Sequence, residues 1–466
     1  MHIEQIYTGC LAQGAYYIES NGEAAIIDPL REVQPYIDLA TSRGAKIKYI
    51  FETHFHADFV SGHLDLSRKT GAPIIYGPNS NPEFEAHMAK DHEVFSLGDC
   101  AIKVLHTPGH TLESTCYLLK DENGKDNALF SGDTLFLGDV GRPDLAQKAA
   151  EMTQEDLAGM LYDSLMNQIM PLADDLIIYP AHGAGSACGK NMMKETLDVF
   201  GNQKKMNYAL NQPSREAFIA AVTDGLTPPP GYFGMNVAMN KKGYTSFDEV
   251  LTNGMQALTA DALETLVNNE EALVLDVRSA ADFAKGFIPR SVNIGLKGDF
   301  APWVGAVIMD VKQPLVLVCN EGDEEEAITR LSRVGFDRVL GYLIGGIQTW
   351  IQANKEIDAV DRIEAEEFAT IYNADNTEVI DVRKESEYSK EHVLHAHSRP
   401  LVYINEWFSS VGKAPFLLHC QGGYRSMIAA SILKARGIHN FKEVDGGYKA
   451  ISATDVAKTS ETITQA

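Results

Sequence analysis

Three side chains that could bind a metal ion stand within five residues of one another near the start of the chain. His54, His56 and Asp58 follow directly after an apolar run at residues 47–51. Such a run is typical of a buried strand, and open sheets place their ligands at the carboxyl ends of strands. Because alternate residues of an extended segment point the same way, the two imidazoles can face one centre. Imidazole and carboxylate are ligands for zinc, manganese and iron, so the spacing predicts a metal site.

Three later apolar runs each end at a glycine or proline turn that carries one more possible ligand. These ligands are His110, Asp133 and His182. Because strand ends of one sheet lie near one another, we expect these side chains to join the first three. The four stretches together predict one buried centre built from strand ends.

A second reactive group is Cys420, at the start of the loop CQGGYRS between an apolar run and a helix-forming segment. Two glycines let such a loop curl so that successive backbone N–H groups point inward and receive an anion. The helix N-terminus adds partial positive charge and Arg425 adds a full one. These features favour a thiolate or a persulfide anion. The expected catalytic residues are Cys420 and Arg425, and the expected substrate-binding residues of the loop are Gly422, Gly423, Tyr424 and Ser426.

The loop belongs to the second copy of an internal repeat. The strings LVLDVR, LVLVC and IGGI recur as EVIDVR, FLLHC and DGGY, with offsets of 101 to 105 residues. The first copy keeps Cys319, but Glu324 stands where Arg425 stands in the second. The carboxylates of that loop raise a thiol pKa and repel anions, so we expect the first copy to be catalytically silent.

Other segments carry ordinary secondary-structure patterns. Residues 155–167 have apolar residues on one helical face, and helices are expected at 191–200 and 214–222. The string TPPPG at 227–231 excludes helix and central strand. Residues from there to about 253 are expected to form a linker against a domain surface.

Composition narrows the class of function. The net charge of −24 argues against nucleic acid and anionic membranes as partners. Apolar runs stay well below the roughly 20 residues of a membrane span, and the start does not resemble a signal peptide. Six cysteines without a C-x-x-C pair fit a reducing, cytoplasmic location. Cys188 and the other cysteines outside the two loops are expected to be core or turn residues.

The first half resembles the metallo-β-lactamase superfamily, with HFHAD, TPGHT, SGDTLF and PAHG in the family order. Both repeat copies resemble rhodanese domains, the second more strongly. The resemblance implies an α/β chain, with a metallo-β-lactamase αββα sandwich followed by two rhodanese-like α/β domains. The domains implied are residues 1–240, a degenerate rhodanese-like domain at 255–356 and a rhodanese domain at 360–456.

The resemblance also implies a reaction. Binuclear hydrolases of the superfamily have a histidine where this chain has Phe59. The chain looks instead like persulfide dioxygenase–rhodanese fusions, which implies one Fe(II) per chain and sulfide detoxification. The persulfide of a low-molecular-weight thiol and O2 would give sulfite, which Cys420 would convert to thiosulfate. The implied iron ligands are His54, His110 and Asp133; His56, Asp58 and His182 would orient them, and Arg142 would bind the anionic substrate.

Two rival functions remain open from the sequence. One is a zinc thioester hydrolase of the glyoxalase II type with an attached sulfurtransferase. The other is a non-catalytic persulfide carrier or sensor that uses Cys420 alone. The sequence also leaves open which thiol carries the persulfide and whether the chain forms a homo-oligomer.

Overall fold

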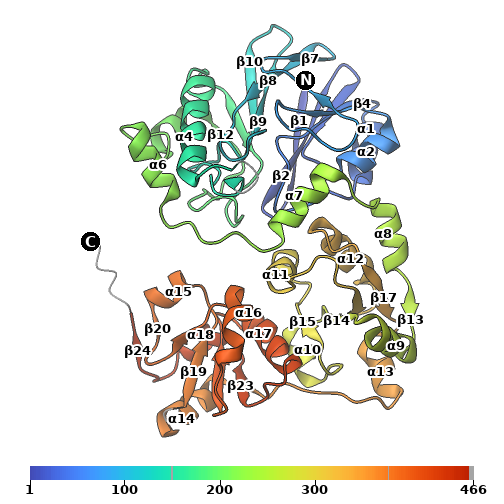
Figure 1. Ribbon diagram of the computed structural model, residues 1–466, viewed down its shortest axis with the longest axis vertical. Helices are drawn as coiled ribbons and strands as arrows, with labels where there is room; N and C mark the ends of the chain where they lie inside the picture. The colour runs from blue at the N-terminus through green and yellow to red at the C-terminus, as the bar shows by residue number, and fades with distance from the viewer. Residues whose placement is uncertain (148–150, 376, 461–466) are drawn as a thin grey trace. The chain divides into compact units, whose positions relative to one another are not determined.

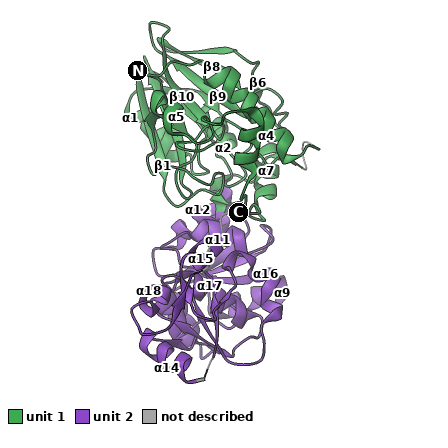
Figure 2. Cartoon of the chain, turned by 90° about the vertical axis from the view of Figure 1, so that its left-hand side faces the viewer, with its two compact units in different colours: residues 1–247, 332–335 green, residues 248–331, 336–466 purple. Residues whose placement is uncertain are grey.

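The computed structural model describes residues 1–147, 151–375 and 377–460 (Figure 1). The chain divides into two compact units, Met1–Phe247 with Ser332–Gly335, and Asp248–Leu331 with Phe336–Ala466 (Figure 2). Among the described residues, no helix is both long enough and apolar enough to cross a membrane.

Two six-stranded sheets form the centre of the first unit as far as it is described. The strands of the first sheet, in spatial order, are β1 (His2–Thr8), β2 (Gln13–Ser20), β3 (Glu23–Ile27), β4 (Lys46–Phe51), β5 (Ile74–Tyr76) and β6 (His87–Met88). Those of the second are β12 (Asp198–Val199), β11 (Ile177–Pro180), β10 (Asp126–Gly132), β9 (Thr115–Lys120), β8 (Cys100–His106) and β7 (Val94–Leu97).

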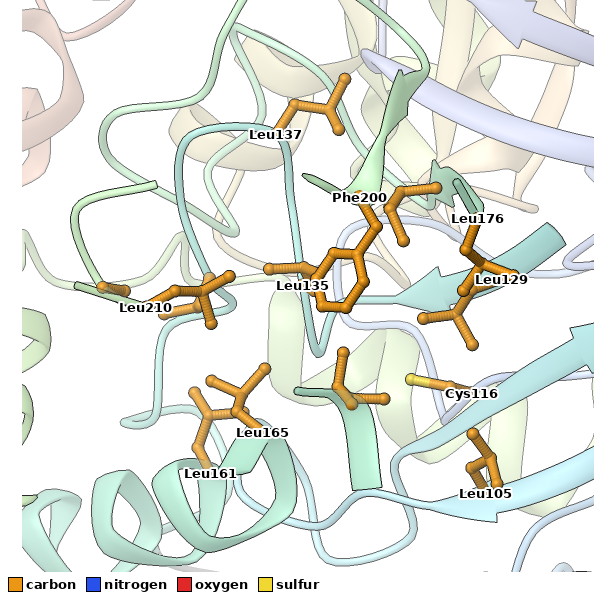
Figure 3. Close-up of a cluster of buried hydrophobic side chains, with 14 of the residues drawn as sticks. Leu105, Cys116, Leu129, Leu135, Leu137, Leu161, Leu165, Leu176, Phe200 and Leu210 are labelled. Atoms are coloured by element: carbon orange, nitrogen blue, oxygen red, sulfur yellow. The ribbon is translucent and has the colours of Figure 1, made fainter. Parts of the chain in front are cut away.

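Three apolar cores show that the sheets are stacked between layers of helix. One core joins the facing sides of the two sheets, with Phe51 from the first and Phe130 from the second. Another lies between the first sheet and the helices α1 and α2. A third lies between the second sheet and α4, where Leu161 packs among leucines (Figure 3). The helices of this unit are α1 (Gln34–Ser42), α2 (His63–Thr70), α4 (Gln154–Ser164) with the π-helical turn η1 (Leu165–Ile169), α5 (Phe200–Met206), α6 (Arg215–Thr223) and α7 (Phe233–Lys242).

The second unit contains the repeat as two parallel five-stranded sheets with the same strand order. The first copy comprises β13 (Ala257–Leu258), α9 (Ala260–Glu270), β14 (Leu273–Asp276), α10 (Ala280–Lys285), β15 (Val292–Asn293), α11 (Phe300–Val307), β16 (Leu315–Val318), α12 (Glu324–Arg333), β17 (Val339–Leu343) and α13 (Gly346–Gln352). Its strand order is β13-β17-β16-β14-β15, and that of the second copy is β18-β23-β22-β19-β21. Helix α8 (Phe247–Gly254) leads into this unit.

The second copy adds short elements to the same frame. It comprises β18 (Arg362–Ile363), α14 (Ala365–Asp375), β19 (Glu378–Asp381), α15 (Glu385–Lys390), β20 (His392–Val393), β21 (His397–Ser398), η2 (Leu401–Tyr403), α16 (Ile404–Trp407), η3 (Phe408–Ser410), β22 (Phe416–His419), α17 (Tyr424–Ala435), β23 (Phe441–Val444), α18 (Gly447–Ile451) and β24 (Lys458–Thr459). Strands β20 and β24 pair separately.

One secondary-structure prediction was wrong. The helix expected at 191–200 is absent from that described stretch, because Asp198 and Val199 pair with β11 and helix α5 begins only at Phe200. The stretch expected to form a linker up to about 253 includes α7 and α8, and Asn240 of α7 binds the loop after β4. Helix α7 forms because it buries Phe233 and Asn236 along one side.

Candidate metal centre and cysteine site

Three buried side chains from three strand ends converge in the first unit. His54 follows β4, His110 follows β8 and Asp133 follows β10, and their ligand atoms lie within 4.8 Å of one another. Asp133 Oδ2 lies 3.3 Å from His110 Nε2 and 3.9 Å from His54 Nε2. Neither carboxylate oxygen of Asp133 has a hydrogen-bond partner among the described residues. Because an unpaired buried carboxylate is costly, this group fits a bound cation.

The hydrogen bond that each imidazole makes through Nδ1 determines which nitrogen faces the centre. His110 Nδ1 lies 2.8 Å from the carbonyl oxygen of Arg142 and donates to it. His54 Nδ1 donates to Thr53 Oγ1 at 3.0 Å, because that hydroxyl donates its own proton to Asp28. Burial, reinforced by neighbouring imidazoles, lowers the pKa of His54 well below its ordinary value. Both Nε2 atoms are therefore free to bind metal.

A second group of possible ligands lies beside the first. His182 Nε2 is 3.4 Å from Asp58 Oδ2 and 3.5 Å from Asp133 Oδ1. His56 belongs to this group, but its Nε2 lies 3.0 Å from Asp28 Oδ1 on the opposite side. The structure thus brings together all six residues expected from the sequence, and divides them into two adjacent sets of three.

Phe59 occupies the place where a further histidine would serve a second metal. Its side chain is fully buried and packs on the His56 ring, with 4.3 Å between ring centroids. A phenyl ring offers no lone pair, so Phe59 cannot serve as the further metal ligand that the resemblance to binuclear hydrolases implies at this position.

Four residues of the centre were not predicted from the sequence. Asp28 and Glu52 are buried acids at the ends of adjacent strands, and both approach His56. Cys188, expected in the core, has its sulfur within 4.8 Å of ligand atoms of Asp133 and His182. Asn240 supports the loop after β4. An acid directly after an apolar strand was the available signal for the first two, whereas nothing local marks the others.

Arg142 contributes through its backbone as well as its side chain. Its carbonyl oxygen accepts the hydrogen bond from His110 Nδ1. Its guanidinium forms an ion pair with Asp144, with N–O distances of 2.6 and 2.7 Å. That guanidinium is buried. A Cβ atom on the preceding Gly141 would stand 1.9 Å from the Asp133 carbonyl oxygen, so this turn requires glycine. The role of Arg142 in binding substrate stays a prediction.

Cys420 directly follows β22 and opens the loop that leads to α17 in the second unit. The Gly423 amide donates to its sulfur at 3.1 Å, and Gly423 has a φ of +95° that favours glycine. The Ser426 hydroxyl lies 3.4 Å from the same sulfur. This arrangement directs one backbone N–H group and one hydroxyl group at the Cys420 sulfur, and the loop sequence predicts inward-pointing donors of this kind.

The other loop side chains have fixed partners. The Arg425 guanidinium forms two hydrogen bonds with Glu387, at 2.6 and 2.8 Å, which lower the pKa of that carboxyl. Ser426 Oγ also lies 2.5 Å from the buried carboxyl of Glu443. Arg425 therefore lies at the site as an ion pair rather than as a free cation.

The equivalent loop of the first copy is arranged differently. Its Gly322 amide donates to the Glu324 carboxylate at 2.8 Å instead of to the cysteine sulfur. Burial, together with Glu324, Asp276 and Asp323, raises the pKa of Cys319 to about 12. The thiol is thus neutral near pH 7, which supports the expectation of a silent copy.

Comparisons with known proteins agree with this geometry. The sequence model of the metallo-β-lactamase superfamily matches residues 8–182, and that of the rhodanese-like domain matches residues 259–353 and 364–454. A hydroxyacylglutathione hydrolase from Francisella tularensis subsp. novicida is 31% identical over 198 residues, which cover 42% of this chain and 71% of that protein. The chain belongs to the metallo-β-lactamase superfamily. Two rhodanese-like domains follow its metallo-β-lactamase domain, and the predicted fold class is confirmed.

Two further relatives define the extent of the likeness. A probable hydroxyacylglutathione hydrolase from Schizosaccharomyces pombe is 31% identical over 167 residues, which cover 35% of this chain and 60% of that protein. The chain spans about half to three fifths of the length of the first curated relatives it matches. The crystal structure of a metallo-β-lactamase from Staphylococcus aureus is 31% identical, with a TM-score of 0.65, and covers 73% of this chain and 98% of that one.

Proposed function

We propose that the first unit is a mononuclear Fe(II) persulfide dioxygenase and that Cys420 is the nucleophile of a thiosulfate-forming sulfurtransferase. The observation that carries the proposal is the pairing of a complete set of two histidines and one carboxylate with Phe59 in place of a further ligand. Two imidazoles and a carboxylate that leave open positions are typical of non-haem iron oxygenases. The rhodanese-like domain that contains Cys420 would supply the sulfane sulfur that converts sulfite to thiosulfate.

The residues of the metal centre would hold and orient the reactants. His54, His110 and Asp133 would bind one iron ion through Nε2, Nε2 and a carboxylate oxygen. Bound there, Fe(II) would supply the chemistry that joins O2 to a thiol persulfide. The His182–Asp58 pair lies beside Asp133 and could hold a proton or orient the substrate.

Cys420 would carry out the second reaction by thiol exchange. Its thiolate attacks the outer sulfur of a thiol persulfide, the sulfur–sulfur bond breaks, and the thiol leaves with the electron pair. Sulfite then attacks the outer sulfur of the Cys420 persulfide, and the Cys420 thiolate leaves as thiosulfate forms. No external oxidant is required, because sulfane sulfur passes between nucleophiles in both steps.

A second candidate function for the first unit is metal-dependent thioester hydrolysis. The names of the curated relatives favour it, since they are hydroxyacylglutathione hydrolases. The ligand group of His56, Asp58 and His182 beside the first also favours it, because binuclear hydrolysis needs two neighbouring metal ions.

Metal content and substrate choice together test these two candidates. We expect the purified chain to contain one iron ion and to consume O2 when supplied with a thiol persulfide. Two zinc ions per chain, with rapid hydrolysis of a hydroxyacyl thioester and no O2 uptake, would overturn the proposal.

All six cysteines are free thiols, which supports placing this chemistry in the reducing cytoplasm.

A further inference from the structure

A pocket of about 660 Å³ opens onto Cys420 within the second unit. Both copies of the repeat line it. The second copy supplies the cysteine loop together with Lys384 and Glu387, and the first copy supplies Lys297, Asp299 and Trp303. The silent copy is therefore part of the wall of the site that contains the reactive cysteine.

The segment of the first copy at this wall, residues 295–299, is fixed from both sides. The guanidinium of Arg330, in α12 of the same copy, donates to the carbonyl oxygen of Gly298 at 2.8 Å. From the second copy, the Tyr424 hydroxyl donates to the Gly295 carbonyl oxygen at 2.8 Å. Because Tyr424 follows the cysteine loop directly, this bond ties residues 295–299 to the Cys420 site.

The charges in the pocket favour an anion. Arg425 is neutralised by Glu387, as described above. In the described part of the chain, neither the Lys297 nor the Lys384 ammonium group takes part in an ion pair. Asp299 contributes one opposing negative charge at the rim. Two unpaired ammonium groups and one carboxylate give the pocket a net positive charge. One of the two ammonium groups, that of Lys297, belongs to the first copy, whose own loop has no amide bound to its cysteine sulfur at Gly322.

We propose that Lys297 is a specificity-determining residue for the Cys420 site, which takes a small sulfur compound bearing an oxyanion group. The inference rests on the proposed sulfur transfer at Cys420 and assigns a function to the first copy. The Lys297 ammonium attracts the sulfonate end of the compound while its outer sulfur meets the Cys420 thiolate. The first copy thus contributes to substrate binding although its own thiol is protonated.

Steady-state kinetics of the full chain test this role, with thiosulfate as sulfur donor and cyanide as acceptor. The Cys420 thiolate attacks the outer sulfur of thiosulfate and sulfite leaves; cyanide then takes the sulfur as thiocyanate and regenerates the thiolate. For Lys297→Ala we expect the KM for thiosulfate to rise about fivefold, with kcat within about twofold of the parent, because one ionic contact is lost. The increase should be smaller for methanethiosulfonate, a monoanionic donor, and Lys297→Arg should restore the parent KM.

Lys285→Ala is the matched control, since Lys285 is an exposed lysine of the same copy that lines the pocket at Cys319 instead. It should leave the KM for thiosulfate unchanged. An unchanged KM in Lys297→Ala, or an equal increase for both donors, would overturn the role of Lys297 while sulfur transfer itself stands. Thiocyanate formation that is the same in the parent and in Cys420→Ser would instead overturn the proposed function, and this inference with it.

Discussion

At the scale of single residues, the hydrogen-bond partner of each imidazole decides what the metal centre can hold. The Nδ1–H group of His110 donates a hydrogen bond to a backbone carbonyl oxygen, and the Nδ1–H group of His54 donates one to the Thr53 hydroxyl oxygen. Both rings are thereby fixed in orientation and in tautomer, with Nε2 facing Asp133. The nitrogen that each ring directs at the centre is therefore the one that can bind a cation.

The variant His110→Ala tests this assignment. Loss of one of three ligands should leave the chain without bound iron and without O2 uptake, while sulfur transfer at Cys420 continues. Metal analysis of the purified variant, combined with an oxygen electrode, measures both. His87→Ala, which alters an exposed histidine, should retain iron and O2 uptake. Retention of full iron content by His110→Ala would show that the ligand set is wrong.

A buried acid behind the cysteine loop gives a second prediction at this scale. Glu443 lies between Ser426 and Arg362, with distances of 2.5 and 2.7 Å. Burial raises the pKa of Glu443 from 4.5 to about 7. The folded state therefore binds this proton more tightly than the unfolded state does. The resulting stabilisation is complete below pH 4.5 and is lost as the pH rises to about 7.

Glu443→Gln removes this titration, so the free energy of unfolding should depend less on pH between 4.5 and 7. Between pH 4.5 and 7, the free energy of unfolding of the parent should fall by as much as about 3 kcal/mol more than that of the variant. All three tryptophans, Trp303, Trp350 and Trp407, lie in the second unit, so urea unfolding followed by tryptophan fluorescence reports this unit alone. Parallel pH profiles for parent and variant would contradict the predicted titration.

The residue types and their spacing predicted the candidate metal ligands but not the side chains that contact and orient them. His54, His110 and Asp133 were predictable because each stands just after an apolar strand, where ligands gather. The approach of Asp28 and Glu52 to His56 was not predicted, although each acid directly follows an apolar strand, because it depends on how these segments meet in the folded chain. The ion pair of Arg425 was missed for the same reason, since Glu387 comes from a different helix.

At the scale of elements, helix α7 holds the loop that carries the first ligands. The Asn240 side chain donates to the carbonyl oxygens of His56 and Phe59, both at 2.8 Å, and accepts from the Ser61 amide at 2.9 Å. One amide group thus satisfies three backbone groups of a buried loop. Helix α7 is a structural part of the metal centre, although it lies more than 170 residues after β4.

Asn240→Ala should loosen this loop without removing a ligand. Each unsatisfied backbone group costs about 1–3 kcal/mol, so we expect the amides at 59–62 to exchange at least roughly tenfold faster. Hydrogen exchange followed by mass spectrometry of the intact chain measures it. Lys241→Ala, at the next position of the same helix, should leave exchange at the loop unchanged. Equal exchange in Asn240→Ala and in the parent would show that α7 is not needed to hold the loop.

The elements differ in how well the sequence predicted them. Helix α6 and the strands before each ligand were predictable, because their apolar pattern is local. Helix α7 was not, because the proline string before it favours an irregular chain and its buried side is partly polar, with Asn236 and Asn240 facing inward. Its burial depends on the polar loop it binds, which no local pattern shows.

At the scale of the whole molecule, the chain combines one candidate metal centre with two copies of a rhodanese-like fold. The copies share a strand order, yet one has a neutral thiol and the other has donors directed at its sulfur. Their similarity was predictable from the repeat, and the raised pKa of Cys319 was predictable from the carboxylates of its loop, Glu324 among them. The contribution of the first copy to the Cys420 pocket depends on contacts between the copies, so it could only be found in the structure.

The measurement that tests the proposed division of labour most directly is product analysis of the variant Cys420→Ser, supplied with a thiol persulfide and O2. Ser cannot form a persulfide, so the variant should consume O2 at a rate similar to the parent and accumulate sulfite in place of thiosulfate. Cys319→Ser is the matched control, and its thiosulfate yield should stay within about twofold of the parent because its thiol is protonated. Alkylation of the sulfur products followed by chromatography quantifies both. An unchanged thiosulfate yield in Cys420→Ser, with no sulfite present, would contradict the account.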